Sequence, residues 1–186
     1  DFVVRDNLKE ISILGYSEKA PIQSYDFSVT NNNDETTHIT ISKKGGHVIN
    51  MNTNRNVSTE VITQEEANEK GKQYLENKGF PNMKETYYLK QEGIVTINYA
   101  YTQDNVVVYP DLIKVKVALD NGEILGVETT GYLNNHEERK IQNIKITQEE
   151  AKKTLNKELE IISEGMAIIP TEWKTEVLCY EFKGKV

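Results

Sequence analysis

Residues 62–67 read Ile-Thr-Gln-Glu-Glu-Ala, and residues 146–151 repeat these six letters unchanged, 84 positions later (146 minus 62). In each copy a threonine stands three residues before a glutamate, which is the spacing of a capping box: the threonine hydroxyl accepts from the glutamate amide, and the glutamate carboxylate accepts from the threonine amide. The paired glutamates also suit the positive end of the helix dipole. A helix start that occurs twice indicates a duplicated structural unit rather than one unique catalytic site.

Each copy of the hexapeptide opens a helical pattern with one narrow apolar stripe. After the first cap the stripe falls at i, i+4, i+7 and i+8, on Ala67, Gly71, Tyr74 and Leu75, and Gly79 supplies the stop. After the second cap the same spacing, on Ala151, Leu155 and Leu159, predicts a helix over 147–159. A helix with so narrow a stripe needs a second element on which to bury it.

Alternating β-branched and aromatic runs predict that this second element is a sheet. Between the two helices, strands are predicted over 86–91, 94–102, 112–119 and 123–129, with Asp120-Asn121-Gly122 as a hairpin turn. The N-terminal segment carries a similar hairpin, 38–42 and 47–53, around Lys43-Lys44-Gly45-Gly46. The C-terminal segment carries its helix and one strand, 176–183, with no closing hairpin.

These patterns predict an α+β chain of three tandem units, each a helix packed on an antiparallel sheet. Unit 1 is 1–57 and lacks most of its helix, unit 2 is 58–142 and is complete, and unit 3 is 143–186 and lacks its closing hairpin. We expect a fragment of a longer protein. Simple truncation is favoured, and the alternative is that the partial ends complete each other within or between chains by domain swapping, which would give a homodimer in light scattering.

Composition excludes several classes of function. The net charge of −7 argues against nucleic acid and against anionic lipid, since binding phosphate needs concentrated lysine and arginine. The mean hydropathy is −0.60, and no stretch approaches the roughly 18 apolar residues of a membrane span. Cys179, the one cysteine, lies in a predicted strand and is interpreted as a structural thiol.

No combination of residues predicts catalysis, so the chain is not expected to be an enzyme and no cofactor or metal is expected. The three histidines, at 38, 47 and 136, lack the spacing and the partners of a zinc site. The glutamate pairs at 65–66 and 149–150 are explained by helix capping. Gly45-Gly46 after two lysines could accommodate an anion, but a hairpin turn explains the pair without a ligand.

Aromatic residues are the candidate interface. Ten tyrosines are present, and tyrosine is favoured both in strands and at interfaces. Half-buried strand positions account for many of them, and the alternative is a face that binds protein or stacks on glycan. The candidate interface residues are Tyr87, Tyr88, Tyr99, Tyr101 and Trp173.

The capped Ile-Thr-x-Glu-Glu-Ala helix, followed by strands and a hairpin with Asp-Asn-Gly-Glu-Ile at 120–124, resembles the PepSY domain. The resemblance is best over 58–142 and at 147–159. It implies a helix on an antiparallel sheet, in proteins that often hold a protease or lytic enzyme in check.

Three such domains in tandem, with Gly-Tyr-Ser-Glu-Lys-Ala-Pro-Ile at 15–22, residues 25–29 and the run 177–182, resemble a family of spore germination proteins of Bacillus and relatives. The resemblance implies a membrane anchor outside this chain, a location at the spore inner membrane and cortex, and a SleB-like cortex-lytic enzyme as partner, restrained until germination. The predicted function is therefore a non-catalytic, inhibitory protein-binding module, and the alternative is a structural scaffold that binds peptidoglycan.

Overall fold

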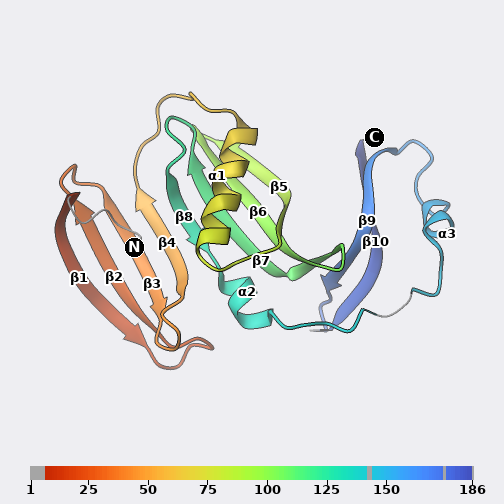
Figure 1. Ribbon diagram of the computed structural model, residues 1–186, viewed down its shortest axis with the longest axis horizontal. Coiled ribbons are helices and arrows are strands. Elements are labelled where there is room, and N and C mark those ends of the chain that lie inside the picture. Colours follow the sequence, from red (N-terminus) through yellow and green to blue (C-terminus); the bar gives the residue numbers. More distant parts are fainter. Residues whose placement is uncertain (1–6, 142–143, 174, 186) are drawn as a thin grey trace.

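A computed structural model describes residues 7–141, 144–173 and 175–185 (Figure 1). The fold is α+β, as predicted, and its strands form one ten-stranded sheet. The strands are β1 (Leu8–Ser17), β2 (Ser24–Asn31), β3 (Thr36–Ser42), β4 (Val48–Asn54), β5 (Met83–Gln91), β6 (Ile94–Gln103), β7 (Val106–Ala118), β8 (Ile124–Glu128), β9 (Glu160–Pro170) and β10 (Glu176–Lys185). The helices are α1 (Gln64–Asn77), α2 (Thr130–Asn135) and α3 (Gln148–Lys152).

The sheet runs continuously through the first two repeats. Its order is β1-β2-β3-β4-β8-β7-β6-β5, so the N-terminal meander joins the central one where β4 pairs with β8. Met51 lies opposite Val127 at this junction, and the hydroxyl of buried Thr129 donates to the carbonyl of Val48 at 2.6 Å. The two repeats are therefore fused edge to edge. The division into units at 57 and 142 stays a prediction.

Helix α1 covers the sheet over β5, β6 and β7, where it buries Ala67, Gly71 and Leu75 (Figure 1). Gly71 is required by a close approach, because a Cβ there would lie 2.3 Å from the Tyr99 hydroxyl. That hydroxyl donates to Asn68, whose Oδ1 lies at 2.8 Å. The helix thus lies directly on the aromatic core of the central strands, as its narrow stripe predicted.

Both predicted capping boxes are present. The Thr63 hydroxyl accepts from the amide of Glu66 at 3.1 Å, and the Glu66 carboxylate accepts from the Thr63 amide at 2.8 Å. Thr147 and Glu150 repeat both bonds, at 3.2 and 2.7 Å. The repeated hexapeptide therefore forms the same N-terminal cap on both helices, although the two helices differ in length.

The helix predicted over 147–159 is wrong in its extent, because α3 ends at Lys152 and buries no residue. Leu155 and Leu159 are only partly covered, and the Asn156 side chain accepts from the Glu158 amide in a turn. A helix this short gains too little from propensity alone and needs a packed face to extend. Strand β9, which was not predicted, pairs with β10 and runs parallel to β7 at residues 106–108.

The two capping threonines give a matched pair of substitutions. Thr63→Ala is expected to lower the free energy of unfolding by about 1 kcal/mol, because it uncaps a helix that packs on the core. Thr147→Ala is expected to change it by less than about 0.5 kcal/mol, since α3 buries nothing. Urea unfolding followed by circular dichroism measures both, and equal losses would contradict the difference in packing.

Candidate protein-interaction surfaces

The structure separates the five aromatic residues predicted as an interface. Tyr99 is fully buried against α1, so its prediction as an interface residue is wrong. The reason is that its ring lies under the helix that packs on β6. Burial raises the pKa of Tyr99 well above its ordinary value. Tyr101 is half-buried and packs edge-on against Tyr132 and His136, at ring distances of 6.3 and 4.6 Å.

The other three aromatic residues are exposed but do not meet. Tyr87 pairs with Asn98 and Tyr88 with Ile97, so these neighbours point to opposite faces of the sheet. Trp173 is 85% exposed in the turn between β9 and β10. Lys183, at the other end of β10, donates to the carbonyl of Thr86 on β5, which places Trp173 away from the tyrosines. The three residues do not form one aromatic platform.

β1 and β2 carry an apolar face that no helix in the described part of the chain covers. Ile13 is 73% exposed and Tyr16 66%, far more than expected for residues on the inner face of a sheet. Strand register places each β1 residue beside its β2 neighbour, Ile13 opposite Phe27 and Tyr16 opposite Tyr25. We call this surface the uncovered face; it consists of Ile11, Ile13, Tyr16, Tyr25 and Phe27.

The uncovered face continues the surface that α1 covers in the central repeat. One row of the sheet runs from Ile13 and Phe27 on β1 and β2 to Ile39, and onward through Met51, Val127, Val115 and Ile97. The central residues of this row share a core with Ala67 and Leu75 of α1. Residues 7–57 contain β1–β4 and no α-helix, so the outer end of the row faces solvent.

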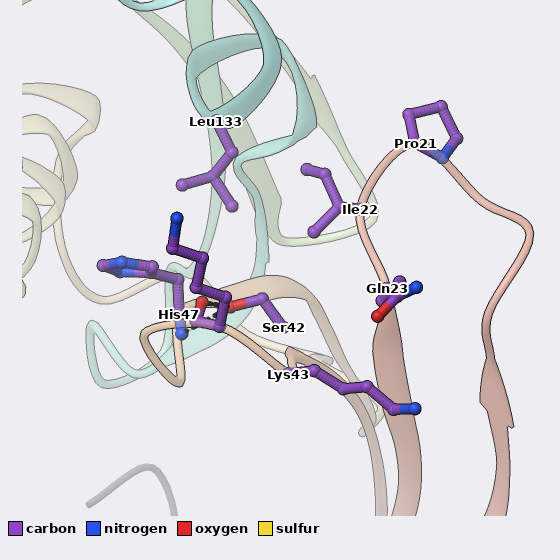
Figure 2. Close-up of a pocket in the computed structure, with 8 residues that line it drawn as sticks. Pro21, Ile22, Gln23, Ser42, Lys43, His47 and Leu133 are labelled. Carbon is purple, nitrogen blue, oxygen red and sulfur yellow. Dashed lines mark hydrogen bonds between the residues drawn. The ribbon is translucent and has the colours of Figure 1, made fainter.

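A pocket of about 350 Å³ lies beside this face, where the N-terminal hairpins meet α2 (Figure 2). Pro21 and Ile22 come from the β1–β2 loop, and Leu133 comes from α2. Figure 2 shows Ile22 and Leu133 pointing toward one another above the β3–β4 turn. That turn contributes the polar wall, which consists of Ser42, Lys43, Lys44 and His47.

A buried ion-pair network joins the C-terminal hairpin to the central repeat. Asp111 on β7 is fully buried, and Arg139 contacts both of its oxygens, at 2.8 and 3.0 Å. The same guanidinium contacts both oxygens of Glu176 on β10, each at 2.8 Å. These bonds raise the pKa of Arg139 above its ordinary value, Glu176 more than Asp111. We call Asp111, Arg139 and Glu176 the clasp.

His136 extends the clasp toward the aromatic residues. Its Nδ1 lies 2.7 Å from Asp111 Oδ2, and its ring stacks on Tyr132 at 4.1 Å. Asp111 is thus surrounded by a guanidinium and an imidazole, while the rings beyond them close the site on the side of α2. This arrangement satisfies a buried carboxylate and fixes the position of β10.

Comparison with known proteins identifies the family of this chain. The model for the PepSY1 and PepSY2 domains of the sporulation protein YpeB matches residues 1–142. The chain belongs to the YpeB family. Its fold is also similar to that of the Bacillus megaterium YpeB C-terminal domain, with a TM-score of 0.87 and 27% identity; the match covers 95% of this chain and 79% of the other.

Sporulation proteins YpeB from three bacteria are similar to this chain. The Halalkalibacterium halodurans protein is 37% identical over 149 residues, which are 80% of this chain and 33% of that protein. The Oceanobacillus iheyensis protein is 34% identical over 184 residues, 98% of this chain and 40% of that protein. The Bacillus subtilis protein is 32% identical over 151 residues, 80% and 34%. The chain therefore spans only 33–40% of the length of these relatives.

None of the YpeB relatives above carries the name of an enzyme. In this YpeB-family chain the described residues hold no group of three or more His, Cys, Asp or Glu side chains placed to bind a metal ion. Within the same residues no helix is long and apolar enough to cross a membrane.

Sequence reasoning missed the clasp and the uncovered face, although signals for both are present. Asp111 falls in phase with the buried positions Ile113 and Val115 of β7, so its carboxylate had to lie inside and to need a cation. Residues 10–13 alternate polar and apolar side chains, which is typical of a strand with one buried face. Neither pattern alone identifies the cation that pairs with Asp111 or shows that the apolar face of β1 stays uncovered.

The clasp makes the stability of this YpeB-family chain depend on pH. Hydrogen bonds from Arg139 hold the pKa of Glu176 below its ordinary value of 4.5. A carboxylate with a lowered folded-state pKa contributes stability above about pH 4.5, and that contribution is lost as the pH falls through the folded-state value. Glu176→Gln is therefore expected to cost stability at pH 7 and progressively less in acid. Urea midpoints at several pH values measure this, and a constant difference between the proteins would contradict it.

Proposed function

We propose that this chain is a non-catalytic module that binds a SleB-like spore cortex-lytic enzyme, stabilises it and restrains it until germination. The observation that supports this most is the uncovered face. A soluble protein exposes contiguous apolar patches mainly where a partner covers them. Family membership supports the setting, since the relatives are sporulation proteins.

The geometry of the uncovered face suits a protein partner. Its side chains lie on strands rather than loops, so they are held in place before binding and little ordering is needed. Tyr16 and Tyr25 add aromatic area with a polar end, which is typical of the centre of an interface. A partner that binds only the folded form also stabilises this chain by mass action, so each protein would protect the other.

The test is a binding and activity assay with the purified lytic enzyme. We expect a complex in size-exclusion chromatography and slower release of fragments from purified cortex when this chain is added. An unrelated acidic domain of similar size serves as the control for ionic effects. Absence of both the complex and the slowing would reject the proposal for this chain.

Trp173 supports a second candidate function, a structural scaffold that binds peptidoglycan. It is almost fully exposed at the tip of a hairpin, where a sugar ring could stack on it. Cosedimentation with purified cortex tests this. Binding that is lost in Trp173→Ala and kept in Tyr88→Ala would support the scaffold, and no cosedimentation would reject it.

A further inference from the structure

We propose that the pocket between the β3–β4 turn and α2 binds the carboxylate of an acidic side chain in an apolar segment of a partner protein. This inference rests on the proposed function and adds the chemistry of one partner residue. The pocket combines a cationic wall with an aliphatic one, so a ligand that fits both carries a negative charge beside an apolar group.

The cationic wall is built by a turn with a fixed shape. The Ser42 hydroxyl donates to the carbonyl of Lys44 at 2.8 Å and accepts from the amide of His47 at 2.9 Å. Gly45 and Gly46 have φ of +83° and +65°, which favour glycine. A Cβ on Gly45 would lie 2.5 Å from His47 Nε2, so the glycine also gives the imidazole its place.

The two lysines of this wall differ in their partners. Lys43 lies 3.3 Å from Glu18 and over the rings of Tyr16 and Tyr25, at 5.4 and 5.3 Å. Lys44 is exposed and forms no ion pair with any residue that the structure describes. A chain with net charge −7 thus presents an available cation at the mouth of a pocket.

Size and lining favour a peptide over a glycan. A volume of about 350 Å³ lies at the small end of the range for ligand pockets, enough for one or two side chains. The aliphatic wall, formed by Pro21, Ile22 and Leu133, offers no aromatic ring for a sugar to stack on. Lys43 borders both the pocket and Tyr16 and Tyr25 of the uncovered face, so one partner segment reaches both.

The experiment titrates ¹⁵N-labelled chain with the blocked dipeptide N-acetyl-leucyl-glutamic acid amide and, separately, with its glutamine analogue. We expect saturable shifts of the amides of residues 43–47 with the acid only. Lys44→Gln should weaken binding about tenfold, since it removes a charge-assisted bond. Lys19→Gln, at an exposed lysine outside the pocket, is the matched control and should bind as the wild type does. Equal shifts with both peptides, or unchanged binding in Lys44→Gln, would overturn the inference.

A second measurement separates this inference from the proposed function. If the lytic enzyme binds the wild type and Lys44→Gln equally, the pocket is not part of the interface and the inference fails while the function stands. If the enzyme does not bind the wild type but the acidic dipeptide does, the proposed function fails and the carboxylate site stands. Weaker binding of the enzyme by Lys44→Gln, and not by Lys19→Gln, supports both.

Discussion

Arg139→Ala is expected to lower the free energy of unfolding by about 3–5 kcal/mol, because it leaves a buried carboxylate without its cation. Asp111 is fully buried, and the Arg139 side chain is itself only 7% exposed, so water cannot replace the lost bonds without opening the site. The substitution also removes the link from β7 to Glu176 on β10. Urea denaturation gives the loss, and hydrogen exchange shows where it falls.

The exchange pattern distinguishes the clasp from a general loss of stability. Amides of β9 and β10 should exchange faster in Arg139→Ala, while those of β2 and β3 should change little. Lys140→Ala, an exposed neighbour, is the control and should stay within about 0.5 kcal/mol of wild type. A loss below about 1 kcal/mol would mean that the clasp contributes little. The double variant Asp111→Asn with Arg139→Ala should lose less stability than Arg139→Ala alone, because the uncharged amide at position 111 no longer needs a cation. The two side chains are in direct contact, so their effects are not additive.

Ile13→Asp combined with Tyr16→Asp is expected to weaken binding to the lytic enzyme by at least about 30-fold, which corresponds to one interface residue of large effect. Both side chains are mostly exposed, so the stability of the free chain should change by less than about 1 kcal/mol. Isothermal titration or surface plasmon resonance measures the affinity. A thermal melt of each variant checks that the fold is retained.

The matched control for the uncovered face is Ile162→Asp on β9, which replaces an isoleucine of similar exposure, 63%. It should bind the enzyme as wild type does. If Ile162→Asp weakens binding as strongly as the double variant, added negative charge rather than the uncovered face explains the effect. If neither weakens it, the enzyme binds elsewhere on the chain.

Local features of the fold were predictable because short-range chemistry determines them. The Thr63 and Thr147 caps, the positive φ of Gly93 and Gly122 at turns, and the alternation of β7 each depend on residues within a few positions. The α+β class follows from them, since a helix with one narrow stripe needs a sheet.

Features that depend on distant residues were not predictable in the same way. Leu155 and Leu159 continue a helical spacing, but they are only partly covered rather than buried, and α3 stops after five residues. Tyr99 and Tyr101 are both strand tyrosines in the sequence, and only the positions of α1 and α2 decide that one is buried and the other half-buried. The partners of Asp111, His136 and Arg139, lie 25 and 28 residues away along the chain.

The C-terminal hairpin is joined to the rest of the sheet through a short parallel pairing of β9 with β7. Residues from β1 to α2 share one apolar core, whereas the C-terminal hairpin adds only two small clusters around Ala167 and Ile168. Its ladder to β7 covers three positions, Val106 to Val108. Beyond this ladder, the hairpin is held by the clasp and by the bonds of Glu181 with Tyr109 and of Lys183 with Thr86. Under a pulling force, or in the presence of a protease, we expect this hairpin to separate before the larger block unfolds. The expected order of unfolding therefore runs from the C-terminal hairpin inward.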